Sequence, residues 1–350
     1  MPDLNERPLL TFALFAYNQE RFIADAVRGA LSQTYTPLEI ILSDDCSSDR
    51  TFEIMQELAA GYQGPNRVIV RRNEQNLGLI GHINRVMELV QGELIVAAAG
   101  DDISLPERVE RTYHAYLESE RSAYSIFSNA IWIDENGCKM NLLRRQPVNS
   151  RALTFLHYGT RSTPGFLNGC THAWKRECFD FFGPLMDGVG AEDTVIPFRS
   201  ALLGNIVYIH DVLVLYRQNR SRMQNHHGKY LYSIYRNNWV KHQRMLLNIF
   251  RNRLQDLEVY LTIHSKTDEI SIVLKFIHEQ ISELSRVVEI FEMPLLRQRL
   301  FEVIKRCTLS NFRNVINQLT CAVIPLQIWY GYLKLIAYYI YQEFQKGNSL

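Results

Sequence analysis

The chain has 350 residues, of which 47% are hydrophobic and 21% charged, a composition that excludes intrinsic disorder. It fits a core of about 200–250 residues with an extension. Its net charge of +1 excludes a global field that would draw it to nucleic acid. Six cysteines without a Cys-x-x-Cys pair argue against a zinc site or a disulfide framework and indicate a reducing compartment. The opening MPDLNERPLL contains no apolar signal region, so we expect a cytoplasmic protein.

Short apolar runs alternate with segments that carry apolar residues every three or four positions. The runs predict strands over 9–16, 38–42, 68–70 and 94–99, and the segments between them predict helices. This order predicts an α/β fold with a doubly wound parallel sheet. Asp49 is expected to cap the second helix. Because parallel strands end at one edge, the polar residues that follow them should converge in one crevice.

The run from Leu94 to Ala99 ends in Gly100, Asp101 and Asp102. Two adjacent carboxylates repel each other unless a positive charge lies beside them. Mg²⁺ and Mn²⁺ carry that charge and prefer oxygen ligands. The pair therefore predicts a metal or ligand site. The alternative is that both acids cap the helix expected over 105–118.

The ends of the first two strands carry groups suited to a nucleotide. Asp44 or Asp45 could accept the N3–H of uracil or thymine, and Tyr17 offers a ring for base stacking. The sequence has no G-x-G-x-x-G or G-x-x-x-x-G-K segment, so an acidic crevice would need a cation to hold an anionic nucleotide. The alternatives are capping by the two aspartates and a core position for Tyr17.

A second polar stretch, Gly188 to Val195, contains Glu192 and Asp193. Its glycines permit a tight turn, and we expect the two acids to open a helix. The helix dipole would then lower the pKa of such a carboxyl group. The alternative is that both acids only stabilise the helix N-terminus.

Several ordered motifs together resemble the family 2 glycosyltransferases, which are inverting nucleotide-sugar enzymes with the GT-A fold. The motifs are Ala16–Tyr17–Asn18, Ser32 to Tyr35, Glu39 to Thr51, Asn76–Leu77–Gly78, Gly100–Asp101–Asp102 and Glu192–Asp193. The resemblance covers residues 8–220. It departs at Phe15, where a small polar residue is common, and at Gly100, which replaces the first carboxylate of the Asp-x-Asp element.

The resemblance implies a role for each matching residue. The nucleotide would bind at Tyr17, Asn18, Asp44, Asp45, Asn76 and Asp101. Within this set, Asp45 would accept a hydrogen bond from the base and Asp101 would face the ribose. Asp102 would bind Mn²⁺ or Mg²⁺. Asp193 would be the catalytic base, with Glu192 as the reserve candidate.

Beyond the acid pair the pattern is less regular. We expect a strand over 123–133, a turn over 134–137, loops over 142–162, a helix start over 175–179 and a strand pair over 206–216.

Tyr216–Arg217 resembles a family segment that often carries a histidine where this chain has Asn219. Arg217 and Arg220 could offset diphosphate charge, with surface ion pairing as the alternative. The candidate replacements for the missing histidine, as phosphate or metal contacts, are His210, His226 and His227.

From residue 229 the strand signals fade, and helical patterns follow over 231–261, 269–291, 294–308 and 324–344. We therefore predict two domains, 1–228 and 229–350, of which the second is a helical extension. The segment 324–344 is rich in tyrosine and aliphatic residues, which favours contact with a membrane surface. The alternative is a helix packed into the domain or against a partner subunit.

These features predict a metal-dependent enzyme that moves a sugar from a nucleoside-diphosphate sugar to an acceptor hydroxyl with inversion. By resemblance, the acceptor is a glycan or a lipid-linked sugar in bacterial surface polysaccharide (O-antigen or capsule) synthesis. Homo-oligomer formation stays open. One alternative is a nucleotidyltransferase, which would need a Gly-rich basic loop where Tyr17 to Glu20 stands. The other is a non-catalytic scaffold, against which Asp102 and Asp193 argue.

Overall fold

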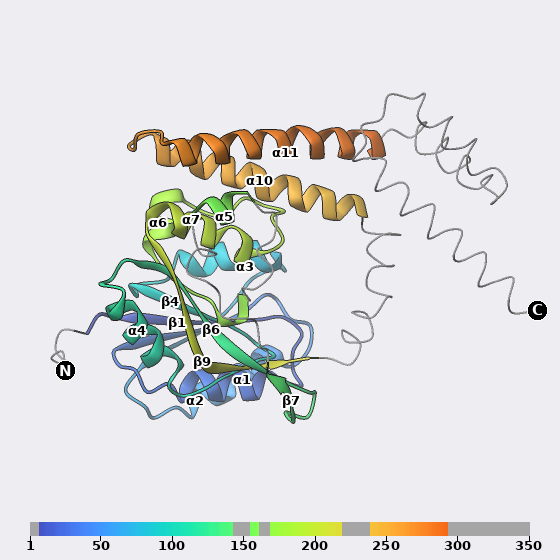
Figure 1. The fold of residues 1–350 in the computed structure, drawn as a ribbon. Coiled ribbons are helices and arrows are strands. Elements are labelled where there is room, and N and C mark those ends of the chain that lie inside the picture. Colours follow the sequence, from blue (N-terminus) through green and yellow to red (C-terminus); the bar gives the residue numbers. More distant parts are fainter. Residues whose placement is uncertain (1–6, 143–154, 161–168, 219–238, 293–350) are drawn as a thin grey trace, which may run out of the picture.

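The computed structural model describes residues 7–142, 155–160, 169–218 and 239–292. The predicted helices over 294–308 and 324–344 lie outside these ranges, as do Asn219, Arg220, His226 and His227. The described part of the chain folds into one mixed sheet covered by helices on both faces (Figure 1). The sheet order is β3-β2-β1-β4-β8-β6-β9-β5, with β7 paired to β6.

The first half of the sheet is parallel, as the alternating pattern predicts. It contains β1 (Leu10–Ala16), β2 (Leu38–Asp44), β3 (Arg67–Arg72) and β4 (Leu94–Ala99). β1, β2 and β4 are nearly continuous apolar runs because helices cover both of their faces. Their carboxyl ends therefore lie at one edge.

The second half of the sheet, beyond the four strands for which parallel pairing is predicted, is mixed. It contains β8 (Ala173–Lys175), β6 (Ala123–Ile133), β9 (Asn205–Arg217), β5 (Ile103–Ser104) and β7 (Lys139–Leu142). β8 runs antiparallel to both β4 and β6, and β5 runs antiparallel to β9. Mixed pairing of this kind follows from tertiary contacts, because a three-residue strand has no direction that its own sequence could reveal.

The strand pair expected over 206–216 is a single strand. β9 runs parallel to β6, and the register changes between the Ser128–Ile209 pair and the Asn129–Val212 pair. His210 and Asp211 are thus bulged out of the ladder, and their polar side chains interrupt the apolar pattern at the bulge.

One layer of helices covers the sheet on the side of α1 (Ile23–Leu31), α2 (Thr51–Ala60) and α4 (Arg108–Glu118). Arg50, not Asp49, is the N-cap of α2, although the Asp49 carboxylate accepts the N–H of Thr51 at 3.0 Å. α4 begins three residues later than expected, so Asp101 and Asp102 lie too far upstream to cap it.

The opposite face is covered by α3 (Gly78–Met87), α6 (Glu177–Phe182) and α7 (Ile196–Leu203). α5 (Phe155–Gly159) forms within the segment expected to be loop. Two long helices, α10 (Trp239–Leu261) and α11 (Asp268–Glu292), lie side by side over α7 (Figure 1). Both end within one residue of the predicted positions.

The long helices share a core with the sheet domain. Ile249 of α10 packs in the cluster that includes Trp174 and Ile196, and Phe250 packs with Phe127 and Phe198. The predicted boundary between 228 and 229 lies outside the described residues. None of the helices in the described part of the chain combines the length and apolar character needed to cross a bilayer.

Candidate functional site

A cavity of about 480 Å³ opens at the carboxyl ends of β1, β2 and β4. Six of the nine predicted site residues line it: Tyr17, Asp45, Asn76, Asp101, Asp102 and Glu192. Asn18, Asp44 and Asp193 do not line it. The convergence that the strand order predicts is therefore present for the residues that end β1, β2 and β4.

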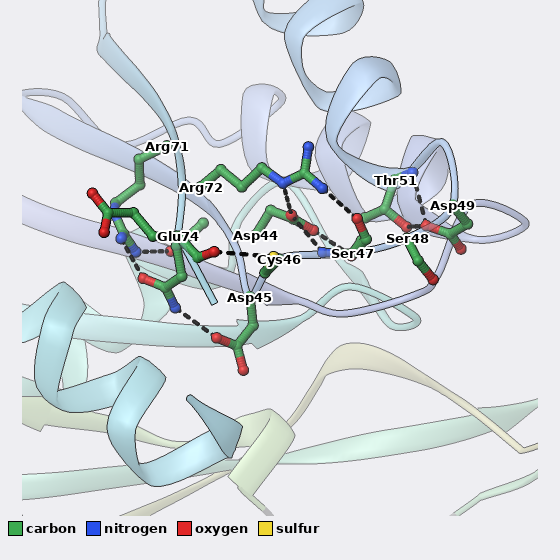
Figure 2. A network of polar contacts seen from close by, with 12 residues as sticks. Asp44, Asp45, Cys46, Ser47, Ser48, Asp49, Thr51, Arg71, Arg72 and Glu74 are labelled. Atoms are coloured by element: carbon green, nitrogen blue, oxygen red, sulfur yellow. Dashed lines mark hydrogen bonds and ion pairs between the residues drawn. The ribbon is translucent and has the colours of Figure 1, made fainter. Parts of the chain in front are cut away.

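Asp44 and Asp45 point in opposite directions, as neighbouring residues at a strand end do (Figure 2). The fully buried Asp44 carboxylate accepts the Ser47 N–H at 2.9 Å and pairs with Arg72 Nε at 3.3 Å. It thereby closes the turn after β2, which is the loop-capping alternative for this residue. Asp45 turns toward the cavity.

The Asp45 carboxylate also connects two loops around the cavity. Its Oδ1 accepts Asn73 Nδ2–H at 2.6 Å and the backbone N–H of Leu77 at 2.9 Å. Asn76 Oδ1 accepts the N–H of Gly78 at 3.1 Å, and Gly78 has a φ of +69°, which glycine adopts without strain. The loop before α3 is thus built onto the end of β2.

Tyr17 is not a core residue, because 48% of its surface is exposed at the cavity. The next residue, Asn18, has a φ of +51° and turns its side chain away to accept the Ser48 N–H at 2.8 Å. Its own N–H donates to Ser47 Oγ at 2.8 Å. Asn18 therefore joins the loops after β1 and β2 and leaves the Tyr17 ring accessible.

Arg217 anchors the acid pair, a role that sequence reasoning missed. Only 3% of its surface is exposed, and it does not line the cavity. Its backbone N–H donates to Asp102 Oδ1 at 2.8 Å, and its Nε donates to the Asp101 carbonyl at 2.9 Å. Nη1 donates to the carbonyls of Asp134 and Glu135, both at 3.1 Å. The prediction that Arg217 offsets diphosphate charge is replaced by this structural role.

A second buried cation, Arg108, also lies behind the acid pair. It donates to Ser104 Oγ at 2.8 Å and to the Ala97 carbonyl at 2.7 Å. Burial lowers its pKa to about 10, and the charge of Asp102 acts in the opposite direction. The protein itself therefore supplies positive charge near the two carboxylates. His210, the described candidate for the missing histidine, does not line the cavity.

Glu192 and Asp193 lie in a 3₁₀ turn (Glu192–Thr194) that precedes α7, so they do not open the helix directly. Asp193 Oδ2 accepts the N–H of Gly169 at 3.2 Å. A Cβ at residue 169 would meet the end of the Glu192 side chain, so the two residues lie close together. Burial, reinforced by the charge of Asp193, raises the pKa of Glu192 to about 8. The expectation that a helix dipole lowers the pKa is wrong for Glu192, because desolvation dominates.

The helix α10 holds this turn from behind. Asn252 Oδ1 accepts the Met186 N–H at 2.8 Å, and Arg253 donates to the Thr194 carbonyl at 2.8 Å. Two adjacent helix residues thus fix both ends of the loop that carries the two acids. Sequence reasoning found no chemistry in the extension. Both residues are buried, and the sequence does not distinguish them from the other polar residues of this helix.

The cavity wall is acidic. Asp45, Asp101, Asp102 and Glu192 line it, and no lysine or arginine occurs among the described residues that do so. The described residues contain no group of three or more His, Cys, Asp or Glu side chains arranged to hold a metal ion by themselves. Mg²⁺ commonly binds through one or two carboxylates plus substrate phosphates, and this donor set fits that mode.

Comparison with known proteins shows what the first half of the chain is similar to. Residues 11–176 match the family model for glycosyl transferase family 2. The matched segment contains the acid pair, whereas Glu192 and Asp193 lie beyond it.

Curated relatives from several organisms are similar to part of this chain. The chain is 35% identical over 224 residues to an uncharacterized Mycobacterium tuberculosis protein, covering 60% of this chain and 59% of the relative. It is 31% identical over 121 residues to the UDP-Glc:alpha-D-GlcNAc-diphosphoundecaprenol beta-1,3-glucosyltransferase WfaP of Escherichia coli, covering 35% and 45%. In three further curated relatives the alignment spans 39% to 48% of the relative's length, so the chain matches half of these proteins or less.

Solved structures share the fold. S. aureus TarS (1-349) in complex with UDP-GlcNAc aligns over 97% of this chain and 92% of that chain, with a TM-score of 0.53 and 15% identity. The mannosyltransferase PcManGT from Pyrobaculum calidifontis, in complex with GDP-Man and Mn²⁺, aligns over 98% and 88%, with a TM-score of 0.50 and 12% identity. The GT-A fold predicted from the sequence is confirmed. The family match favours an enzyme over the scaffold alternative.

Proposed function

We propose that the protein is a metal-dependent inverting glycosyltransferase that takes its sugar from a nucleoside-diphosphate sugar. The observation that carries this proposal is the acidic cavity at the strand ends of a family 2 domain. A diphosphate is anionic, and the described cavity wall offers it carboxylates without a lysine or arginine. A divalent cation held by Asp102 and the diphosphate would resolve this conflict of charge and stabilise the leaving group.

The nucleotide would lie along the half of the cavity formed by β1, β2 and α3. Asp45 would accept the N–H of the base, because both described hydrogen bonds of its carboxylate go to Oδ1 and Oδ2 takes part in none of them. The exposed Tyr17 ring would cover the base, and Asp101 would face the ribose. Asn18 and Asp44 would act indirectly, since they hold the loops that carry these side chains.

Asp193 is the proposed base. It would remove the proton of the acceptor hydroxyl while the acceptor oxygen bonds to the anomeric carbon. The bond from that carbon to the diphosphate breaks at the same time, which inverts the configuration. Glu192 is less suited to this role at neutral pH, because a pKa of about 8 leaves it protonated. A protonated carboxyl group has no capacity to accept a second proton.

The acceptor is proposed to be a glycan or a lipid-linked sugar of bacterial surface polysaccharide synthesis, used at the membrane surface. WfaP, which is similar to part of this chain, is named for an acceptor linked to diphosphoundecaprenol. Contact with the membrane would involve the segment 324–344, which lies outside the described residues.

A panel of nucleoside-diphosphate sugars, each with Mn²⁺, with Mg²⁺ or with EDTA, tests the proposal. At least one donor should raise the melting temperature and be hydrolysed slowly, and only with metal present, because a ligand that binds the native state stabilises it. Asp102→Asn should abolish the metal-dependent part of the shift. Asp211→Asn, on the exposed bulge of β9, is the control and should keep it. A panel without any metal-dependent shift would reject the proposal.

A further inference from the structure

His82 is a histidine of the cavity wall that none of the roles above uses. It lies on α3, only 3% of its surface is exposed, and it lines the cavity. Its ring packs edge-on against Phe15 with 5.2 Å between the ring centroids. Phe15 is the position where the sequence departs from the small polar residue common in the family. A buried histidine at this place has a defined orientation, so its hydrogen bonds can be assigned.

The protonation of the His82 ring follows from its neighbours. Arg71 Nη1, which can only donate, lies 2.6 Å from Ser43 Oγ, and Ser43 Oγ lies 2.6 Å from His82 Nε2. Among the described residues Ser43 Oγ has no other acceptor, so its single proton goes to Nε2. Burial lowers the pKa of His82 to about 4, so the ring is neutral at pH 7. Nε2 therefore accepts, and the proton of the ring lies on Nδ1.

The remaining nitrogen of the His82 ring thus becomes a donor in a cavity that also contains a carboxylate acceptor. Nδ1 takes part in none of the hydrogen bonds between described residues, and the residue faces the cavity. Asp45 lines the same cavity, near enough for its charge to act on the His82 ring. Asn73 joins the two sides, because it donates to Asp45 Oδ1 and accepts from Arg71. The Nδ1–H of His82 and the carboxylate of Asp45 therefore belong to the wall of the same cavity.

We propose that His82 determines base specificity and that, together with Asp45, it selects bases with a carbonyl next to a ring N–H. This inference rests on the proposed function. Uracil, thymine and guanine have that edge, with the carbonyl toward His82 Nδ1–H and the N–H toward Asp45. Cytosine and adenine present an amino group beside an unprotonated ring nitrogen. The amino donor would then face the His82 N–H donor, and the ring-nitrogen acceptor would face the Asp45 carboxylate.

Calorimetric titration with UDP, CDP, GDP and ADP in the presence of Mn²⁺ tests the inference. UDP and CDP differ only at this edge, and a bidentate hydrogen-bonded pair typically discriminates by about fivefold to 100-fold. The full chain should bind UDP at least about tenfold more tightly than CDP, or GDP more tightly than ADP. His82→Leu should reduce that ratio several-fold, whereas His82→Asn, which keeps a donor near the Nδ1 position, should restore most of it.

His172→Leu is the matched control. His172 is another buried histidine whose Nε2 pairs with a serine, Ser125 Oγ at 2.8 Å, but it does not line the cavity. Its loss should leave the UDP-to-CDP ratio unchanged. Ser43→Ala keeps the His82 ring and removes the partner that fixes its proton, so it should lower the ratio by less than His82→Leu. Ser43→Ala is therefore the test variant if His82→Leu does not fold.

The outcomes separate the two claims. Preference for CDP or ADP, or a ratio that neither His82→Leu nor Ser43→Ala changes, overturns the role of His82 and leaves the proposed function intact. Binding of none of the four nucleotides with Mn²⁺ overturns the proposed function and the inference together.

Discussion

The two sides of the cavity are built in different ways. The donor side comes from β1, β2, β4 and the loop before α3, and its hydrogen bonds join neighbouring loops, such as Asp45 to Leu77, 32 residues apart. The transfer side consists of Gly169, the Glu192–Thr194 turn and the helix behind them, and Arg253 reaches Thr194 across 59 residues. The nucleotide should therefore depend on the loops that follow the strands and on Arg217, which holds the acid pair, and the transfer step on the packing of α10.

The largest expected difference between the two sides comes from substituting Asp193. Asp193→Asn keeps an oxygen for the Gly169 N–H and removes the proton acceptor. General-base assistance is worth about 10²–10⁴-fold, so transfer should fall by that factor while donor affinity is unchanged. Steady-state transfer rates and donor titrations, once donor and acceptor are known, measure both quantities.

Glu192→Gln is the control for that experiment and should lower the transfer rate by a smaller factor. If Asp193→Asn retained near-normal turnover and Glu192→Gln lost it, the base would be Glu192.

Substitution of Arg217 tests the donor side, because this residue holds the acid pair in place without lining the cavity. Arg217→Lys removes the contacts to Asp134 and Glu135 and loosens the backbone at Asp101. Lysine keeps the backbone N–H that Asp102 Oδ1 accepts, so the variant shifts the acid pair without removing that partner. Because disturbing the surroundings of a metal ligand typically costs up to about 10–100-fold in metal affinity, we expect a loss of about tenfold in Mn²⁺-dependent nucleotide binding.

Arg199→Lys is a matched control for Arg217→Lys. Arg199 is equally buried and also holds loop carbonyls, those of Gly183 and Pro184, but it pairs with Asp256 away from the cavity. It should lower stability and leave Mn²⁺-dependent binding unchanged. Equal losses of nucleotide affinity in both variants would show that Arg217 acts only through general stability.

Substitution of Arg253 should destabilise the transfer side without affecting the donor side. Arg253→Met leaves the buried Thr194 carbonyl without this donor, which costs about 1–3 kcal/mol of folding free energy. Donor affinity should survive, and hydrogen exchange should rise in residues 186–194 ahead of β1 and β2. Uniformly faster exchange throughout the sheet would contradict a local role.

The most gradual expected effect, spread over several pH units, is a pH dependence of stability from Glu192. Its pKa is about 8 in the folded state against an ordinary 4.5, so between these values the folded state holds the extra proton. Stability should therefore fall as pH rises through this window, by at most about 1.4 kcal/mol per pH unit. Urea unfolding of the wild type and of Glu192→Gln at pH 5, 6.5 and 8 measures this. The variant should show a flatter profile, and parallel profiles would refute the assignment.

The elements that the sequence determined are those set by local periodicity. Apolar runs covered on both faces leave little choice but buried strands, and β4 and β6 have the predicted bounds. Polar residues directly after such strands must lie at their carboxyl edge, which is why Tyr17, Asp45, Asp101 and Asp102 meet in one cavity. Their placement needed only strand direction, and parallel connections fix that direction.

Tertiary structure alone decided what depends on contacts between distant segments. The direction of β8 depends on its neighbours, because three residues carry no pattern of their own. The neutral state of His82 and the raised pKa of Glu192 follow from desolvation by the elements packed around them. Arg217 is buried by the same kind of packing, and the composition of the chain encodes none of these three properties. Six of the cavity-facing residues were thus readable from the sequence, whereas His82 and the residues that hold and tune the site became visible only once the chain had folded.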